Sequence, residues 1–204
     1  MGLFDRSIKD PAMLAAERER VPPGQTVTEK WPVLTYGDPP LVDTATWSLT
    51  LSGLVQRPVS LSWADLMSLP VAAVTCDMHC VTRWSKLGNR FEGVRVRHVL
   101  ERAGPSPGAT HVMAHSYGGY TTNLPLADLM DDDALLAFRY EAEPLSAEHG
   151  GPCRLLVPKL YLWKSAKWVN GLELMDGDRP GFWERAGYHM YGDPWKEERH
   201  GWAW

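Results

Sequence analysis

Hydrophobic and polar residues alternate along residues 47–51, and this period of two predicts a half-buried strand. Between residues 96 and 103 the apolar residues recur at helical spacing, and Gly104 follows, so a helix that ends at this glycine is expected. Ser62 offers an N-cap for a second helix, which Pro70 ends at about residue 69.

Further apolar runs complete the expected set of elements. Short helices are predicted over residues 10–20 and 125–130, and residues 21–45 carry five prolines, which predict an extended arm laid over the domain. Strands and short helices follow one another without a regular strand–helix–strand alternation, so the α+β class is expected. The remaining predicted strands cover residues 71–76, 110–116, 134–139, 153–157 and 166–174.

Length and charge narrow the class of protein. The chain has 204 residues, which suits one domain, and we expect an N-terminal extension over residues 1–26 and the domain itself over 27–204. A net charge of −4 does not indicate a basic surface that would bind nucleic acid. No apolar run approaches the roughly 18 residues of a membrane span, and the first residues lack the apolar core of an export signal. A cytoplasmic protein is therefore expected.

The first candidate for chemistry is Cys80, which follows a predicted strand. His79 precedes it and Arg83 lies three residues later. Cationic neighbours lower the pKa of a thiol, and a thiolate is a nucleophile or a ligand for soft metals. Taken alone, a cysteine at the end of a strand is more often a buried structural residue, which is the interpretation that we favour for Cys76 and Cys153. Three cysteines argue against a disulfide framework.

The second candidate is the stretch of residues 149–172, which contains no Asp or Glu. Surface lysines are usually just solvated, but here apolar residues and Ser165 lie between the cations. A buried phosphate monoester binds such an arrangement of fixed cations, a hydroxyl and backbone N–H groups. The four cations are Arg154, Lys159, Lys164 and Lys167.

A third candidate is the end of the predicted strand over residues 110–116. His115 and Ser116 stand there, just before the glycine pair Gly118 and Gly119, in a polar and aromatic stretch that is typical of the edge of a site. A single histidine in such a place is more often a surface or core residue whose hydrogen bonds are made within the protein.

Taken in order, these stretches resemble the molybdopterin-dependent oxidoreductases of the sulfite oxidase family. The resemblance is greatest to the small bacterial branch and, after that, to the catalytic subunit of a methionine sulfoxide reductase system. The residues that carry the resemblance are 79–85 (HCVTRWS), 150–158 (GGPCRLLVP) and 164–167 (KSAK), supported by 118–122 and 188–199. Members of this family fold as a compact mixed α+β domain, so the resemblance implies the same class as the pattern of elements.

The resemblance implies a molybdenum centre held by the pyranopterin dithiolene of molybdopterin, in its monophosphate form, and by Cys80. Oxygen-atom transfer to or from a small oxo-substrate (an S-oxide, an N-oxide or a sulfite-like compound) is expected, with molybdenum cycling between its +6 and +4 states and with Arg83 and His79 orienting the substrate. The residues expected to contact the cofactor are Trp31, Pro32, His115, Ser116, His149, Arg154, Lys164, Ser165 and Lys167.

Two departures from the family pattern affect the expected substrate and partner. Sulfite oxidases carry a cluster of arginines after the metal-binding cysteine, whereas this chain has only Arg83 there, so a substrate other than sulfite is open. The sequence contains no haem-attachment motif. A separate protein is therefore expected to donate or accept the electrons.

Other classes of function remain open at this stage. Cys80 could serve a hydrolase or transferase with His79 or His115 as base, and such an enzyme would purify without molybdenum. A non-catalytic module that stores or inserts the pterin would bind it without a redox-active metal signal. An adaptor domain would use the ten tryptophans for an interface, but it leaves the ordered motifs unexplained.

Overall fold

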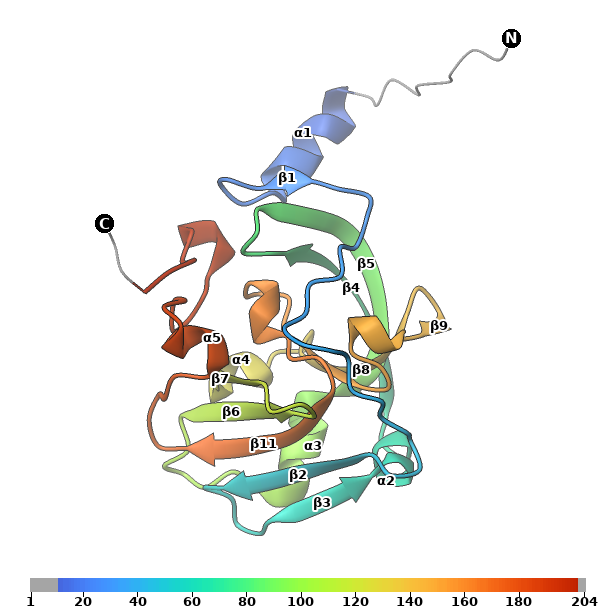
Figure 1. Ribbon diagram of the computed structural model, residues 1–204, viewed down its shortest axis with the longest axis vertical. Coiled ribbons are helices and arrows are strands. Elements are labelled where there is room, and N and C mark those ends of the chain that lie inside the picture. Colours follow the sequence, from blue (N-terminus) through green and yellow to red (C-terminus); the bar gives the residue numbers. More distant parts are fainter. Residues whose placement is uncertain (1–10, 202–204) are drawn as a thin grey trace.

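Two β-sheets and a few short helices make up the computed structural model, which describes residues 11–201 (Figure 1). The strands dominate and the helices have at most nine residues, so the α+β class predicted from the sequence is confirmed. Within the described residues, no helix is long and apolar enough to cross a membrane.

The lower sheet in Figure 1 has five strands in the order β3-β2-β11-β6-β7. Only β2 and β11 pair in parallel, and the other neighbours are antiparallel. The chain therefore returns to the centre of this sheet with its last strand, after it has built the second sheet. The bounds are β2 (Ser48–Gly53), β3 (Val59–Ser62), β6 (His111–Ser116), β7 (Thr121–Pro125) and β11 (Val169–Met175).

Helix α3 (Val96–Ala103) buries its apolar face in the main core together with strand β2. Its four buried residues are those that the helical spacing singled out, and Gly104 caps the helix with a φ of 66°. The predicted N-cap is also confirmed: Ser62 and Asp65 form a capping box at the start of α2 (Trp63–Met67). Local pattern and capping chemistry therefore determine both helices.

The second sheet is organised around β5, which pairs with β1, β4 and β8. Strand β10 lies beyond β8, and its first residue, Arg154, lines the same cavity as Cys80, which follows β4. This arrangement places the cation-rich part of the chain next to the segment of Cys80. The bounds are β1 (Thr26–Val27), β4 (Val71–His79), β5 (Trp84–Arg95), β8 (Leu135–Tyr140), β9 (Glu143–Pro144) and β10 (Arg154–Leu156).

Strand β5 has 12 residues, the most of any described strand, and the sequence pattern does not predict it. Its buried positions include the polar residues Ser85 and Asn89, so no alternation of apolar and polar residues is visible. Gly93 adds to the ambiguity, yet it is required there, because a Cβ would lie 2.3 Å from the carbonyl oxygen of Leu136. Pairing with three other strands therefore overrides a weak local preference.

The other predicted elements are found with shifted ends. The predicted N-terminal helix is α1 (Pro11–Glu19) and the helix of residues 125–130 is α4 (Leu126–Leu129). The strand predicted from residue 166 starts at Val169, since Trp168 adopts a positive φ of 51°. The remaining short helices are η1 (Ala147–His149), η2 (Leu162–Lys164), α5 (Phe182–Arg185) and η3 (Pro194–Lys196).

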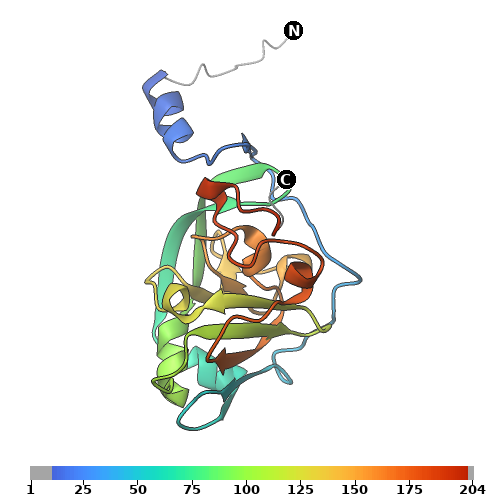
Figure 2. The ribbon, with the colours of Figure 1, turned by 90° about the vertical axis from the view of Figure 1, so that its left-hand side faces the viewer.

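The N-terminal segment follows the outside of the domain. Helix α1 projects from one end, and the chain after β1 runs along the body without a further helix or strand until β2 (Figure 2). This confirms the extended arm predicted for residues 21–45, apart from the two residues of β1, which pair with the start of β5. Because β1 includes both Thr26 and Val27, it spans the predicted domain boundary, and that boundary stays a prediction.

Candidate functional site

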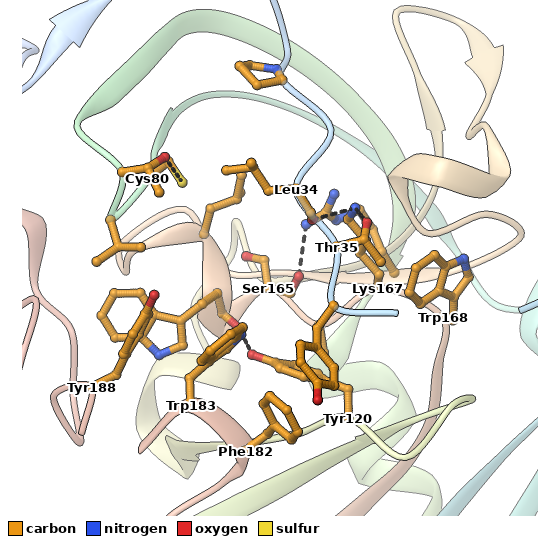
Figure 3. A pocket seen from close by; sticks show the side chains of 18 of the residues that line it. Leu34, Thr35, Cys80, Tyr120, Ser165, Lys167, Trp168, Phe182, Trp183 and Tyr188 are labelled. Atoms are coloured by element: carbon orange, nitrogen blue, oxygen red, sulfur yellow. Dashed lines mark hydrogen bonds between the residues drawn. The ribbon is translucent and has the colours of Figure 1, made fainter. Parts of the chain in front are cut away.

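A cavity of about 380 Å³ lies between the arm, the β4–β5 hairpin and the segment that follows β10. Cys80 lies at one side of this cavity, and Lys167 and Trp168 lie at the other (Figure 3). Six of the twelve residues predicted to form a site line it, namely Trp31, Pro32, Cys80, Arg154, Ser165 and Lys167.

The backbone of the β4–β5 hairpin fixes the position of Cys80. The N–H of Cys80 donates to the carbonyl of Trp84 at 2.9 Å, and the N–H of Arg83 donates to the carbonyl of Cys80 at 3.0 Å. Arg83 closes the turn in the left-handed region, with a φ of 70°. A side chain from the arm, Gln25, also donates to the carbonyl of Cys80, at 3.0 Å. Hydrogen bonds to both the N–H and the carbonyl of Cys80 therefore fix the backbone that carries the thiol.

The sulfur of Cys80 is nearly buried, with 6% of the residue exposed. The hydroxyl of Thr82 donates to it at 3.1 Å. Burial raises the pKa of the Cys80 thiol, whereas the hydrogen bonds of Thr82 and Val81 and the charge of Arg199 act in the opposite direction. Among the described residues no histidine lines this cavity, so no imidazole is placed there as a general base for the sulfur.

The opposite side of the cavity holds a buried guanidinium. Arg154 is 1% exposed and donates to the carbonyls of His149 at 3.0 Å, Ser165 at 2.8 Å and Leu155 at 3.4 Å. Along residues 11–201 no carboxylate forms an ion pair with it. Burial lowers the pKa of Arg154 to about 10. A buried charge without a counter-charge is costly, so this position favours an anionic ligand.

Lys167 adds a second cation to the same side. Its Nζ donates to the carbonyls of Glu148 and Leu34 at 2.6 and 2.9 Å and to the hydroxyl of Thr35 at 2.7 Å. No carboxylate of the described chain pairs with it either. Burial, with the nearby charge of Arg154, lowers the pKa of Lys167 to about 8. Two cations without a carboxylate partner among the described residues favour an anionic ligand at this side of the cavity, which we call the candidate anion site.

Gly150 allows these two cations to come together. It adopts a φ of 104°, and a Cβ on it would lie 2.9 Å from the Cβ of Lys167 and 3.1 Å from the Cβ of Arg154. Any larger residue would therefore separate the side chains. Ser165 lies beside them: its Oγ accepts from the N–H of Val157 at 2.9 Å, which leaves its own hydrogen available to a ligand.

The ring of Trp31, from the arm, covers this anion site. It stacks on the imidazole of His149 with 3.8 Å between centroids, and the guanidinium of Arg154 lies 5.4 Å from its centre. His149 itself does not line the cavity, and burial lowers its pKa to about 4, so it adds no charge at neutral pH. The arm is therefore part of the wall of the cavity.

Aromatic side chains form one wall of the cavity, with Tyr188 at the end toward Cys80 and Tyr120 at the end toward Lys167 and Trp168 (Figure 3). Trp183 stacks on Tyr188 with 5.1 Å between centroids, and the edge of Trp163 meets Tyr188 at the same distance. Burial raises the pKa of Tyr188, and the proximity of Cys80 adds to this effect. Tyr120 donates from its hydroxyl to the carbonyl of Trp163 at 2.6 Å. This wall is thus largely apolar and aromatic, with phenol hydroxyls among its polar groups, and Thr82 places a further hydroxyl beside the sulfur of Cys80.

Lys164 does not line the cavity. Its side chain is 0% exposed, and its Nζ lies 2.7 Å from Oε1 of Glu184. It also donates to the carbonyls of Asn123 at 2.8 Å and Met190 at 2.6 Å. All its hydrogens therefore have protein partners, and the ion pair joins η2 to α5.

Five other predicted residues also lie outside the cavity lining. His79 is buried with its Nδ1 2.8 Å from Oγ of Ser85, and burial lowers its pKa to about 4, whereas Arg83 is exposed. His115 pairs with Glu173 at 3.2 Å, and Ser116 is buried with no partner for its hydroxyl among the described residues. The predicted roles of these residues, and of His149, stay predictions.

Several residues that line the cavity were not among the predicted site residues: Leu34, Thr35, Tyr36, Tyr120, Trp168, Phe182, Trp183 and Tyr188. The high content of tryptophan was the available signal, but it does not say which rings face a cavity. Cys76 and Cys153, interpreted as structural, are free thiols that do not line it.

Comparison with known proteins points to one family. Residues 36–183 match the oxidoreductase molybdopterin-binding domain. The chain is 47% identical to YuiH of Bacillus subtilis, named as an uncharacterized oxidoreductase, over 90% of this chain and 93% of that protein. It is 30% identical to the methionine-sulfoxide reductase catalytic subunit MsrP of Gluconobacter oxydans, over 72% of this chain and 52% of that protein.

More distant similarities cover less of the other protein. Sulfite oxidase of Arabidopsis thaliana is 29% identical over 76% of this chain and 49% of its own length. This chain therefore spans about half of MsrP and of sulfite oxidase. Among solved structures, sulfane dehydrogenase SoxCD from Paracoccus pantotrophus superposes with a TM-score of 0.65 over 92% of this chain and 57% of that one. At 20% identity this likeness shows the fold.

Proposed function

Because the chain belongs to the family of oxidoreductase molybdopterin-binding domains, we propose that it transfers an oxygen atom to or from a small oxo-substrate and that Cys80 is the protein ligand of molybdenum. Family membership makes the chain an oxidoreductase with molybdenum and molybdopterin as cofactor. One observation carries the finer proposal. The same cavity has the thiol of Cys80 at one side and, at the other, two cations that no carboxylate of the described residues pairs with.

The residues that line the cavity fit the cofactor. A thiolate is a suitable ligand for a soft metal, and Cys80 supplies the lining sulfur. Arg154, Lys167 and the hydroxyl of Ser165 would bind the terminal phosphate, which would give the two buried cations the counter-charge that they lack. Two cations suit the monophosphate form. Trp31 would cover this end of the group.

When bound, the cofactor supplies two-electron chemistry with transfer of an oxygen atom, and the protein supplies orientation and electrostatics. Tyr188 would donate a hydrogen bond from its phenol to the oxygen of the substrate, since it lies close to Cys80. Phe182 and Trp183 would exclude water and contact the apolar part of the substrate. Thr82 would keep the sulfur of Cys80 oriented through its hydrogen bond.

The charges that line the cavity favour an uncharged substrate over a sulfite-like anion. Arg154 and Lys167 are its only lysine or arginine residues within the described chain, and the phosphate would occupy both. Arg83, the one arginine that follows Cys80 closely, is exposed and does not line the cavity. An oxyanion near Cys80 would lose its water without gaining a lining cation, which is unfavourable. An S-oxide or N-oxide with apolar substituents suits this wall better.

A cysteine-dependent hydrolase or transferase is less well supported. It needs a base close to the sulfur, whereas His79 is directed to Ser85 and His115 to Glu173. Such an enzyme would also leave the anion site without a role. A non-catalytic pterin-binding module does not agree with membership of a family of oxidoreductases.

A separate protein is proposed as electron donor or acceptor, as expected from a sequence without a haem-attachment motif. A cytoplasmic location also stays a prediction. The absence of a membrane-spanning helix from the described residues does not test it.

The proposal is tested by the metal and pterin content of the purified protein and by turnover with a reduced viologen dye. We expect one molybdenum per chain, reduction of phenyl methyl sulfoxide and trimethylamine N-oxide, and no sulfite oxidation. Cys80→Ala should lower turnover by more than about a thousandfold, because even loss of a hydrogen-bonding partner of a metal ligand costs about 10–100-fold. Cys76→Ala, on strand β4 just before Cys80, is the matched control and should keep full turnover. A Cys80→Ala enzyme with normal turnover would falsify the ligand assignment.

A further inference from the structure

Two side chains that are distant in the sequence hold the backbone at Cys80 from outside the hairpin. Arg199, in the C-terminal tail, donates from Nη1 to the carbonyl of Val81 at 2.8 Å and from Nη2 to the carbonyl of Pro23 at 3.3 Å. Gln25, in the arm, donates to the carbonyl of Cys80 at 3.0 Å. The consecutive carbonyls of Cys80 and Val81 are therefore each hydrogen-bonded by a side chain from near one end of the described chain.

The guanidinium of Arg199 is nearly buried beside the turn of Cys80. Its side chain is 7% exposed and packs over the ring of Tyr161, with 4.9 Å between the guanidinium carbon and the ring centre. Its one carboxylate contact within the described residues, Glu197, is 3.7 Å away. Hydrogen bonds to a charged group are worth more than neutral ones, so the contact with Val81 is a strong restraint on the turn.

Three buried polar atoms that have no hydrogen-bond partner among the described residues belong to this same set of side chains. They are Oε1 of Gln25, the hydroxyl of Tyr161 and Nε of Arg199. Both Gln25 and Arg199 act on the pKa of the Tyr161 phenol in the lowering direction, against the raising effect of burial, so the three side chains lie close together. The amide oxygen accepts, the guanidinium N–H donates and the phenol can do either. One buried water commonly makes about three hydrogen bonds to groups of this kind.

We propose that Arg199, Tyr161 and Gln25 form a polar clamp, completed by one ordered water, that fixes the turn of Cys80. Arg199 is its central positioning residue. The proposal rests on the proposed function only in taking Cys80 as the metal ligand. The clamp contacts the backbone carbonyls of Cys80 and Val81 and makes no contact with the sulfur of Cys80. The position of the sulfur is therefore fixed through the backbone.

Amide hydrogen exchange of the cofactor-free, full-length protein tests the clamp. Arg199→Met should raise exchange of residues 80–84 by roughly tenfold or more, because a charged hydrogen bond is lost, and should leave β11 unchanged. Arg199→Lys should be intermediate, since an ammonium can hold one carbonyl. Arg57→Met is the matched control, because Arg57 also donates to a backbone carbonyl, that of Arg102, in another part of the chain.

Two results would overturn the clamp: unchanged exchange of residues 80–84 in Arg199→Met, or an equal rise in β11, which would mean that the tail stabilises the whole fold. A high-resolution crystal structure tests the water, which should lie within about 3.2 Å of all three atoms and be absent in Tyr161→Phe. A dry site in the wild type contradicts that part of the proposal. Since exchange is measured without cofactor, its outcome is independent of the metal content that tests the ligand.

Discussion

Arg154 and Lys164 are both fully buried cations, ten positions apart in the sequence, in surroundings of opposite character. Lys164 has a carboxylate at 2.7 Å and further partners on β7 and after α5. Within residues 11–201, the hydrogen-bond partners of Arg154 are backbone carbonyls only, and Arg154 faces a cavity. The first arrangement is complete within the protein, whereas the second lacks a negative charge. Pairing, rather than charge or burial, therefore separates a structural cation from a ligand-binding one.

The largest expected effect tests the complete pair. Lys164→Met should lower the free energy of unfolding by about 3–5 kcal/mol, because it leaves Glu184 buried without its cation. Glu184 also accepts from Trp163 at 2.9 Å and from Thr122 at 3.0 Å, so the aromatic wall should loosen as well. Urea denaturation of the cofactor-free protein measures the loss.

The double variant Lys164→Met/Glu184→Gln is the control, and it should recover part of the lost stability by removing the unpaired charge. If Lys164→Met unfolds at the wild-type urea concentration but loses cofactor, then Lys164 belongs to the anion site after all, and the contrast with Arg154 is wrong.

Arg154→Met should have the reverse profile. Loss of the guanidinium should weaken cofactor binding by about 2–5 kcal/mol, which is typical when one partner of a buried charged contact is removed. The stability of the cofactor-free protein should change far less than in Lys164→Met, since relief of an unpaired charge offsets the three lost carbonyl contacts. Pterin content after purification and urea denaturation of the cofactor-free form together measure both effects. Normal pterin content would contradict the anion site.

The sequence alone places Arg154 beside the cavity correctly, but it does not predict the structural ion pair of Lys164. The spacing of the cationic stretch indicates an anion site, and Arg154, Ser165 and Lys167 do line the cavity. Lys164 belongs to the same short motif as Ser165 and Lys167, but its partner Glu184 is 20 residues away and lies on α5. A tertiary ion pair of this kind leaves no local pattern, so the sequence could not separate Lys164 from its neighbours.

The fold shows the same division between local and distant causes. The helix at residues 96–103 and the N-cap at Ser62 follow from spacing and capping chemistry, and both are found. Strand β5 has buried polar residues and is fixed by its three neighbours, so it was missed. The aromatic wall depends in the same way on how α5 packs, and only the count of aromatic residues hinted at it.

Lys167 gives the smallest and most specific test, because its charge can be removed by pH. Burial and Arg154 lower its pKa to about 8 from an ordinary 10.5. A bound anion favours the protonated amine and raises this pKa again. Above pH 8 the amine must therefore take up a proton when the anion binds, and the affinity should fall by up to about tenfold per pH unit. Calorimetric titration of the cofactor-free protein with sulfate, whose charge is constant in this range, measures the slope.

The stability of the cofactor-free protein should respond to pH with the opposite sign. Between pH 8 and 10.5 the unfolded chain holds the proton of this lysine and the folded chain does not, so the contribution of Lys167 to the free energy of unfolding rises with pH. Between pH 8 and 9, below the pKa of Arg154, Lys167→Met should remove both slopes, whereas Lys196→Met, at an exposed lysine of η3, should change neither. Sulfate binding that stays constant from pH 7 to 9, below the pKa of about 10 of Arg154, would mean that Arg154 alone holds the anion.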